Sequence, residues 1–199
     1  SFVNVACMHT YSINSDERKT VIGILGFLSI ALVLIIKNNV RLPHWLPVPS
    51  VFAVFGLLYW LFDQFIWKWS LVKWCLSTPD LNGSWTFLMK SSRDNYAVEY
   101  RGTLTITQTW SKIYIYMDGE KAIGKSVMAG IEIHTSKSFT LKWEYLSQRK
   151  PEFAENEYMH FGMTRVMNQQ GDSISVLKGD YYADRSRHSS GPVTIIKEQ

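Results

Sequence analysis

The chain has 199 residues, 46% of them hydrophobic, and carries 21 Lys and Arg against 17 Asp and Glu, for a formal net charge of +4. Six basic and three acidic residues precede residue 76, so the excess is +3 there, against +1 (fifteen minus fourteen) in the rest of the chain. This division argues against a broad DNA- or RNA-binding face on the C-terminal part, and two cysteines, Cys7 and Cys75, are too few for a disulfide framework or a metal knuckle.

Two apolar runs near the N-terminus predict a transmembrane hairpin. The first covers residues 21–36 without a charge, and the second covers residues 46–67 and is interrupted only by Asp63 and Gln64. With Thr20, the first run would form a helix of about 25 Å, near the lower limit for a span. Trp and Tyr crowd the ends of the second run, as at membrane interfaces. The alternatives are a buried hairpin in a soluble protein and a signal peptide, which the early second run disfavours.

Basic residues beside these runs predict the orientation of the hairpin. Four of them flank its outer ends, and two, Lys37 and Arg41, lie in its turn. Because positive charge collects on the cytoplasmic side, both the N-terminus and the C-terminal domain are expected there. Asp63 is expected near the interface, within reach of headgroup water, and not as a functional intramembrane carboxylate. The expected domains are a tail over residues 1–19, the hairpin over 20–75 and a soluble domain over 76–199.

From residue 82 onward, alternating polar and apolar residues predict eight strands. They are expected at residues 84–90, 96–107, 112–117, 121–133, 138–145, 157–166, 173–181 and 192–197. Short strands of near-even spacing predict an up-and-down antiparallel β-barrel of the lipocalin-like kind, which can enclose one small ligand. A two-sheet sandwich is the alternative. The aromatic-rich inward rows could equally do no more than fill the barrel.

Residue patterns of catalysis or metal binding are not found. Five histidines are scattered without an HxxxH spacing or paired cysteines, and neither a phosphate-binding Walker loop nor a GxSxG elbow occurs. The sequence therefore indicates no enzyme, no metal and no cofactor.

Short motifs at both ends of the β-rich region carry a resemblance to a known family. Residues 83–85 read Gly-Ser-Trp, the Gly-x-Trp opening of lipocalin-like barrels, and residues 179–191 read Gly-x-Tyr, then Arg, then Gly. Together with the two preceding spans, this order resembles the two-transmembrane, β-strand-rich (2TM–β-barrel) effectors of bacterial CBASS anti-phage defence. The resemblance covers residues 20–199.

The resemblance implies a signalling effector of the bacterial inner membrane. In this family a CD-NTase makes a cyclic nucleotide during infection, the β-barrel binds it, and the protein forms homo-oligomers that disrupt the membrane and kill the cell. The implied ligand is a cyclic dinucleotide or a related cyclic oligonucleotide, and the implied partners are membrane lipid and further copies of the chain. Two alternatives belong to other classes: a membrane-tethered carrier of lipid or another hydrophobe, and a barrel that scaffolds protein partners.

Candidate ligand-binding residues are aromatic, to stack on bases, or cationic, to bind phosphates. Arg185 matches the Arg that follows Gly-x-Tyr in the family, and the others come from strand phase and side-chain chemistry. The set is Trp85, Tyr100, Trp110, Trp143, Arg165, Lys178, Tyr181, Arg185 and Arg187.

Overall fold

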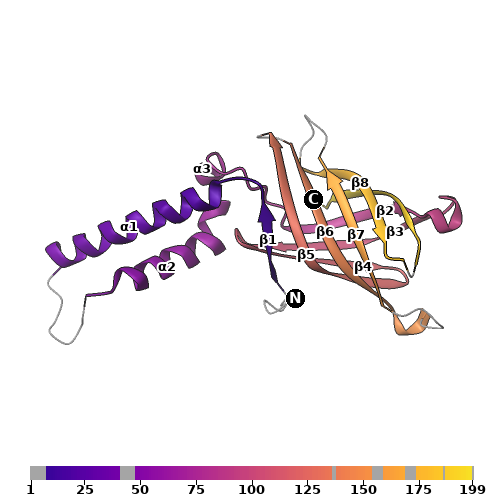
Figure 1. Cartoon of the computed structure of the whole chain (residues 1–199), viewed down its shortest axis with the longest axis horizontal. Helices are drawn as coiled ribbons and strands as arrows, with labels where there is room; N and C mark the ends of the chain where they lie inside the picture. Colours follow the sequence, from indigo (N-terminus) through magenta and orange to yellow (C-terminus); the bar gives the residue numbers. More distant parts are fainter. Residues whose placement is uncertain are drawn as a thin grey trace. The chain divides into compact units, whose positions relative to one another are not determined.

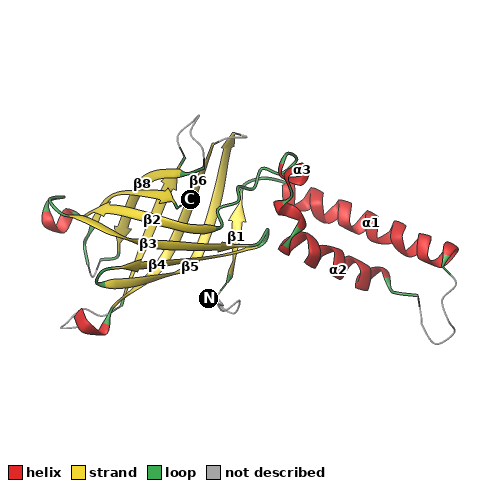
Figure 2. Ribbon diagram, turned by 180° about the vertical axis from the view of Figure 1, so that it is seen from behind, coloured by secondary structure: helices red, strands yellow, loops and turns green. Residues whose placement is uncertain are grey.

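The computed structural model describes residues 8–40, 48–135, 138–153, 159–168, 174–185 and 187–198. The chain divides into two compact units, a helical unit at Ser15–Ser77 and a β unit made of Ser1–Asn14 with Thr78–Gln199. Figures 1 and 2 show the helices of the first unit and the strands of the second.

The helical unit contains two helices long and apolar enough to cross a membrane. They are α1 (Glu17–Asn39) and α2 (Val51–Gln64), and the second candidate span continues through η2 (Ile66–Lys68) before the short α3 (Ser70–Lys73). At 1.5 Å per residue, the 23 residues of α1 give about 35 Å. The helix is longer than the predicted apolar run because it begins at Glu17 and ends at Asn39, which adds charged and polar residues at both ends.

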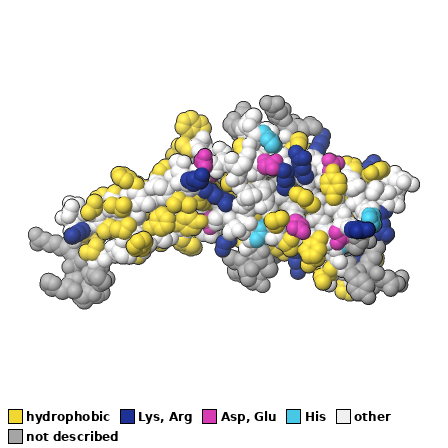
Figure 3. Space-filling view, viewed as in Figure 1, with side chains coloured by type: hydrophobic (Ala, Val, Ile, Leu, Met, Phe, Trp, Pro, Cys, Tyr) yellow, Lys and Arg dark blue, Asp and Glu magenta, His cyan; other side chains and the backbone are white. Residues whose placement is uncertain are grey.

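Apolar side chains on both helices face outward. Phe27 is 74% exposed and Phe52 is 87% exposed, and Figure 3 shows hydrophobic side chains along these helices while charged ones gather over the strands. A helix that is hydrophobic all round belongs in a core or a membrane, and these side chains find no core. Asp63 is 6% exposed and accepts a hydrogen bond from Gln64 Nε2 at 3.1 Å. This side chain is therefore buried in the protein, and its expected position near the membrane interface stays a prediction.

All eight predicted strands overlap strands of the β unit. They are β2 (Gly83–Lys90), β3 (Glu99–Gln108), β4 (Lys112–Gly119), β5 (Ala122–Thr135), β6 (Ser138–Arg149), β7 (His160–Met167), β8 (Val176–Ala183) and β9 (Ser190–Lys197). Each pairs antiparallel with the next along the chain, and β9 pairs with β2, so the sheet closes into a ring. A single closed ring of strands is therefore present, and not the two stacked sheets of a sandwich.

A ninth strand joins this ring. β1 (His9–Ile13) lies within the segment expected as a tail over residues 1–19, and it pairs antiparallel with β4 and parallel with β5. Its Tyr11 is only 2% exposed. The sequence prediction of eight strands differs here because five residues with one large inward side chain are too short to show an alternation.

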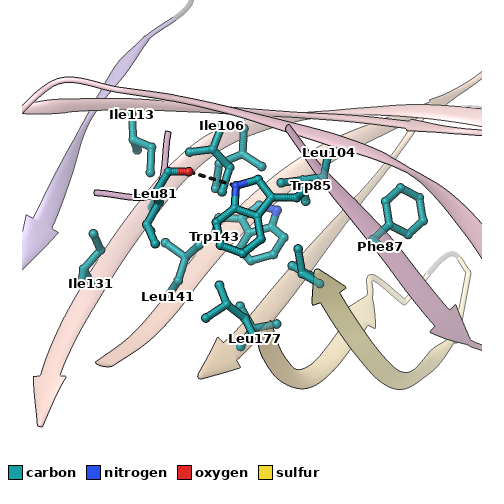
Figure 4. Packing of buried hydrophobic residues seen from close by; sticks show 14 of the residues in the cluster. Leu81, Trp85, Phe87, Leu104, Ile106, Ile113, Ile131, Leu141, Trp143 and Leu177 are labelled. Carbon is teal, nitrogen blue, oxygen red and sulfur yellow. Dashed lines mark hydrogen bonds between the residues drawn. The ribbon is translucent and has the colours of Figure 1, made fainter. Parts of the chain in front are cut away.

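One end of the ring is filled with large apolar side chains. Figure 4 shows Leu81, Trp85, Ile113, Leu141 and Leu177 packed together, with the Trp85 indole N–H donating to the carbonyl of Leu81 at 3.0 Å. Packing of this kind leaves no room for a ligand at this end.

Gln108 forms hydrogen bonds with the segment that precedes β2, at the filled end of the ring. The amide side chain of Gln108 accepts from Leu81 N at 2.9 Å and donates to the Pro79 carbonyl at 3.1 Å. The Asn82 side chain in turn bonds the backbone N–H and C=O of Gln108, at 2.7 and 3.0 Å. These buried bonds determine where the chain enters the ring after the helical unit.

Candidate ligand-binding cavity

The other end of the ring contains a cavity of about 330 Å³. Its walls come from β2 to β9, at the end where the β2–β3, β4–β5, β6–β7 and β8–β9 connections lie. The inward side chains of these strands pack as a core in one half of the ring and line the cavity in the other half. The cavity therefore lies inside the ring, above the packed core.

Aromatic side chains provide much of the cavity wall: Phe87, Tyr100, Trp143, Tyr145 and Tyr181. Two of them lie across glycines of the neighbouring strand. A Cβ added at Gly162 would lie 2.3 Å from the Tyr145 ring, and one added at Gly102 would lie 2.5 Å from the Phe87 ring. Because each ring lies flat against the wall, less of the interior is occupied and flat faces border the cavity.

Polar atoms among these aromatics can act as hydrogen-bond donors. Burial raises the pKa of Tyr145, so its phenol stays neutral at physiological pH. A hydrogen bond from the Tyr100 hydroxyl to Asp94 Oδ2, 2.9 Å long, raises the pKa of Tyr100. The Trp143 indole N–H is buried and has no acceptor among the described residues. A buried donor without a partner is costly.

Cationic side chains outnumber acidic ones around the cavity. Its described lining contains one acidic residue, Glu120, and five cationic ones: Arg93, Arg101, Lys121, Arg149 and Arg187. Some of these cations have acidic partners, as Arg101 Nη2 lies 2.8 Å from Glu99 Oε1. The excess of cationic over acidic residues in the lining favours an anionic ligand.

Arg187, one of these cations, lies close to a buried histidine of the cavity wall. Its Nη1 lies 3.4 Å from the Nδ1 of buried His160. Desolvation raises the pKa of Tyr145, and the Asp94 hydrogen bond raises the pKa of Tyr100. The positive charge of Arg187 acts in the opposite direction and lowers both pKa values. Arg187 therefore lies within electrostatic range of both phenols and close to the His160 ring.

Four of the nine predicted site residues line the cavity: Tyr100, Trp143, Tyr181 and Arg187. Trp85 and Trp110 are fully buried elsewhere, since Trp85 belongs to the packed core and the Trp110 carbonyl accepts a hydrogen bond from Tyr11. Arg165, Lys178 and Arg185 are exposed and do not line the cavity.

Strand phase explains the outward cations. On β7, buried and exposed residues alternate from His160 onward, so Arg165 has the phase of exposed Phe161 and Met163. Lys178 follows buried Leu177 on β8 and points out for the same reason. The family motif indicated Arg185, in the β8–β9 connection, whereas the cation of that connection that lines the cavity is Arg187.

Several residues that line the cavity were not among the residues predicted from the sequence. Arg149 continues the inward row of Trp143, Tyr145 and Ser147 on β6, so extending the predicted strand beyond residue 145 would have found it. His160 begins the inward row of β7. Arg93 and Lys121 lie in connections between strands, where alternation carries no information.

Comparison with known proteins assigns both units. Residues 76–197 match the family described as Cap15, cyclic dinucleotide receptor domain, and residues 19–68 match the one described as Cap15, TM helices. CD-NTase-associated protein 15 of Yersinia aleksiciae is 27% identical over 187 residues, which cover 89% of this chain and 87% of the relative. The predicted resemblance to two-transmembrane CBASS effectors is thereby confirmed, and the chain belongs to the Cap15 family of membrane proteins, with two apolar helices ahead of a receptor domain.

Proposed function

We propose that this protein is a membrane-anchored effector of anti-phage signalling whose cavity binds a cyclic dinucleotide, or a related cyclic oligonucleotide, made by a CD-NTase. The observation that carries the proposal is that Arg187 lines one cavity together with the aromatic side chains Tyr100 and Tyr145. This cavity lies in the region that matches the cyclic dinucleotide receptor domain.

The chemistry of such a ligand suits the cavity. A cyclic dinucleotide has two phosphates and two flat bases, and the lining offers cations for the phosphates and aromatic faces for the bases. Neutral phenols can donate to phosphate or base oxygens without adding charge. A lipid carrier would need an apolar cavity with few cations, whereas the lining of this one contains five. Chemical catalysis is not part of the proposal.

Membrane damage in this proposal comes from assembly. Each span satisfies its own backbone hydrogen bonds within lipid, so a single hairpin does not open a bilayer. Ligand must therefore favour a homo-oligomer in the inner membrane, and this coupling cannot exceed its difference in affinity for the assembled and unassembled protein. We further propose that β2 to β9 form a lipocalin-like barrel on the cytoplasmic side, the side that the basic residues flanking the spans favour.

Calorimetry on the full-length protein in detergent tests ligand binding, with cyclic di-AMP, cyclic di-GMP and cyclic GMP–AMP as probes. Arg187→Ala should remove a charged hydrogen bond of about 1.5–3 kcal/mol, which weakens binding roughly tenfold or more. Arg165→Ala is the matched control, because it removes an exposed Arg from the outer wall. Absence of binding heat across the panel, with co-purified lipid, would overturn the receptor proposal in favour of the carrier.

Dye release from liposomes tests the membrane step. Leu32→Arg places a charge in α1 at a cost of about 2.5–3.5 kcal/mol at the bilayer centre. Nucleotide-triggered leakage should be lost in this variant while nucleotide binding persists. Leakage at full rate without nucleotide, or an oligomer size that ignores it on cross-linking, would contradict the signalling mechanism.

A further inference from the structure

β1 occupies a slot between two strands that part from each other. β4 and β5 pair with each other only near their shared turn, from Tyr116↔Lys125 to Asp118↔Ile123. Beyond that point the pairing of β5 with β6 has a register irregularity between Ser126 and Met128. From there on, β1 lies between β4 and β5. It pairs with β4 at two positions and with β5 at three, so β4 and β5 do not face each other there.

Few but specific bonds hold β1 in this slot. Tyr11 is buried, and its hydroxyl donates to the Trp110 carbonyl at 2.7 Å. Asn14, just after the strand, bonds both the N–H and the carbonyl of Ile133, at 2.7 and 3.1 Å. By comparison, β2 and β3 are joined at eight registered positions. Segments with the fewest backbone pairs open at the lowest free energy, and β1 has this character within the ring.

Ser126 connects the slot to the ring. Its hydroxyl accepts from Ile115 N at 2.9 Å and lies 2.8 Å from His9 Nε2. One side chain thus bonds β4 and β1 from its place on β5, at the position where the strands part. A change in the β4–β5 pairing would alter all three strands at this position.

The cavity and the slot share the same two strands. Met117, Ile123 and Gly124 of the paired β4–β5 segment line the cavity, whereas no described residue of β1 does. The other ends of β4 and β5 hold β1. Only residues 14–16 separate β1 from α1, a connection of about 10 Å at most. β1 is therefore the element that connects a cavity wall to the first membrane span along the shortest stretch of chain.

We propose that β1 is a latch: a nucleotide in the cavity shifts the pairing of β4 with β5, β1 leaves its slot, and α1 becomes free to assemble with other copies. This inference rests on the proposed function and adds the step between binding and assembly. β1 lies outside both regions that match the family, residues 19–68 and 76–197, so the family match gives it no role. Release requires that the nucleotide bind the β1-free ring more tightly than the β1-bound ring.

A reversible cross-link tests the latch in the full-length protein. Thr10 and Lys112 are exposed partners across β1 and β4, so Thr10→Cys with Lys112→Cys, in a background with Cys7→Ser and Cys75→Ser, can fasten the strand. The matched control is Ser84→Cys with Thr105→Cys across β2 and β3. Liposomes containing each oxidised protein are tested for nucleotide binding and dye release with the cyclic nucleotide panel above.

The expected result is that oxidation of the β1–β4 pair abolishes leakage, preserves nucleotide binding and is reversed by reductant, while oxidation of the control pair leaves leakage intact. Full leakage from the oxidised β1–β4 protein overturns the latch and leaves the proposed function standing. Absence of binding or leakage in the reduced proteins overturns the proposed function itself. Hydrogen exchange gives a second measurement that needs no disulfide: amides of His9–Ile13 should exchange faster with nucleotide than without, and unchanged exchange there contradicts release.

Discussion

The two ends of the strand ring are made from the same strands with the same alternation, yet one is a core and the other a cavity. At the filled end, the Trp85 N–H has an acceptor and the packed side chains are mostly aliphatic. At the open end, tyrosines, arginines and a histidine join aliphatic residues in the wall, and Trp143 belongs both to the packed cluster and to the cavity lining. Inward orientation is thus shared, and function depends on what the inward residues leave unfilled.

The largest effect is expected from truncating the filled end. Trp85→Ala should destabilise the β unit by about 3–5 kcal/mol, because a fully buried ring is lost from close packing. Urea unfolding of the full-length protein in detergent, followed by near-ultraviolet circular dichroism, measures this change. A loss below about 1 kcal/mol would show that the filled end does not stabilise the ring.

A matched pair of indole replacements separates the packed core from the cavity lining more finely. Trp85→Phe removes a hydrogen bond to Leu81, whereas Trp143→Phe removes a donor that has no acceptor among the described residues and changes a side chain that lines the cavity. Trp85→Phe should therefore cost about 1 kcal/mol more in unfolding free energy, and Trp143→Phe should weaken nucleotide binding more. The same unfolding assay and calorimetry compare the two variants. Equal effects on both quantities would mean that the two indoles do not differ as described.

The smallest effect concerns Tyr145 and alkaline pH. Because burial raises its pKa above the ordinary value of about 10, the unfolded chain ionises this phenol before the folded one does. The stabilising contribution is complete below about pH 10 and is lost as the pH rises toward the folded value. Between about pH 8 and 10.5, the unfolding free energy should fall less in Tyr145→Phe than in the parent protein. An identical fall in both would contradict the buried, neutral state of this side chain.

Much of the fold could be predicted because its patterns are local. An uncharged apolar run needs no distant partner to indicate a span, and the two apolar helices are present. Alternation located eight strands, each overlapping an observed one, because a strand with one face in a core repeats every second residue. β1 escaped because its five residues are recognised as a strand only through the slot that β4 and β5 form.

The sequence by itself thus determined the two apolar helices, the eight long strands and the inward phase of residues such as Trp143 and Tyr181. Only the tertiary structure decided which inward residues border a cavity, since Trp85 and Trp143 have the same local pattern and pack in the same cluster, but of the two only Trp143 also lines the cavity. It also placed Arg187 inside and Arg165 outside. The physical reason is that periodicity reports which side of a strand a residue faces, whereas depth along the ring and an unfilled volume depend on how all the strands pair.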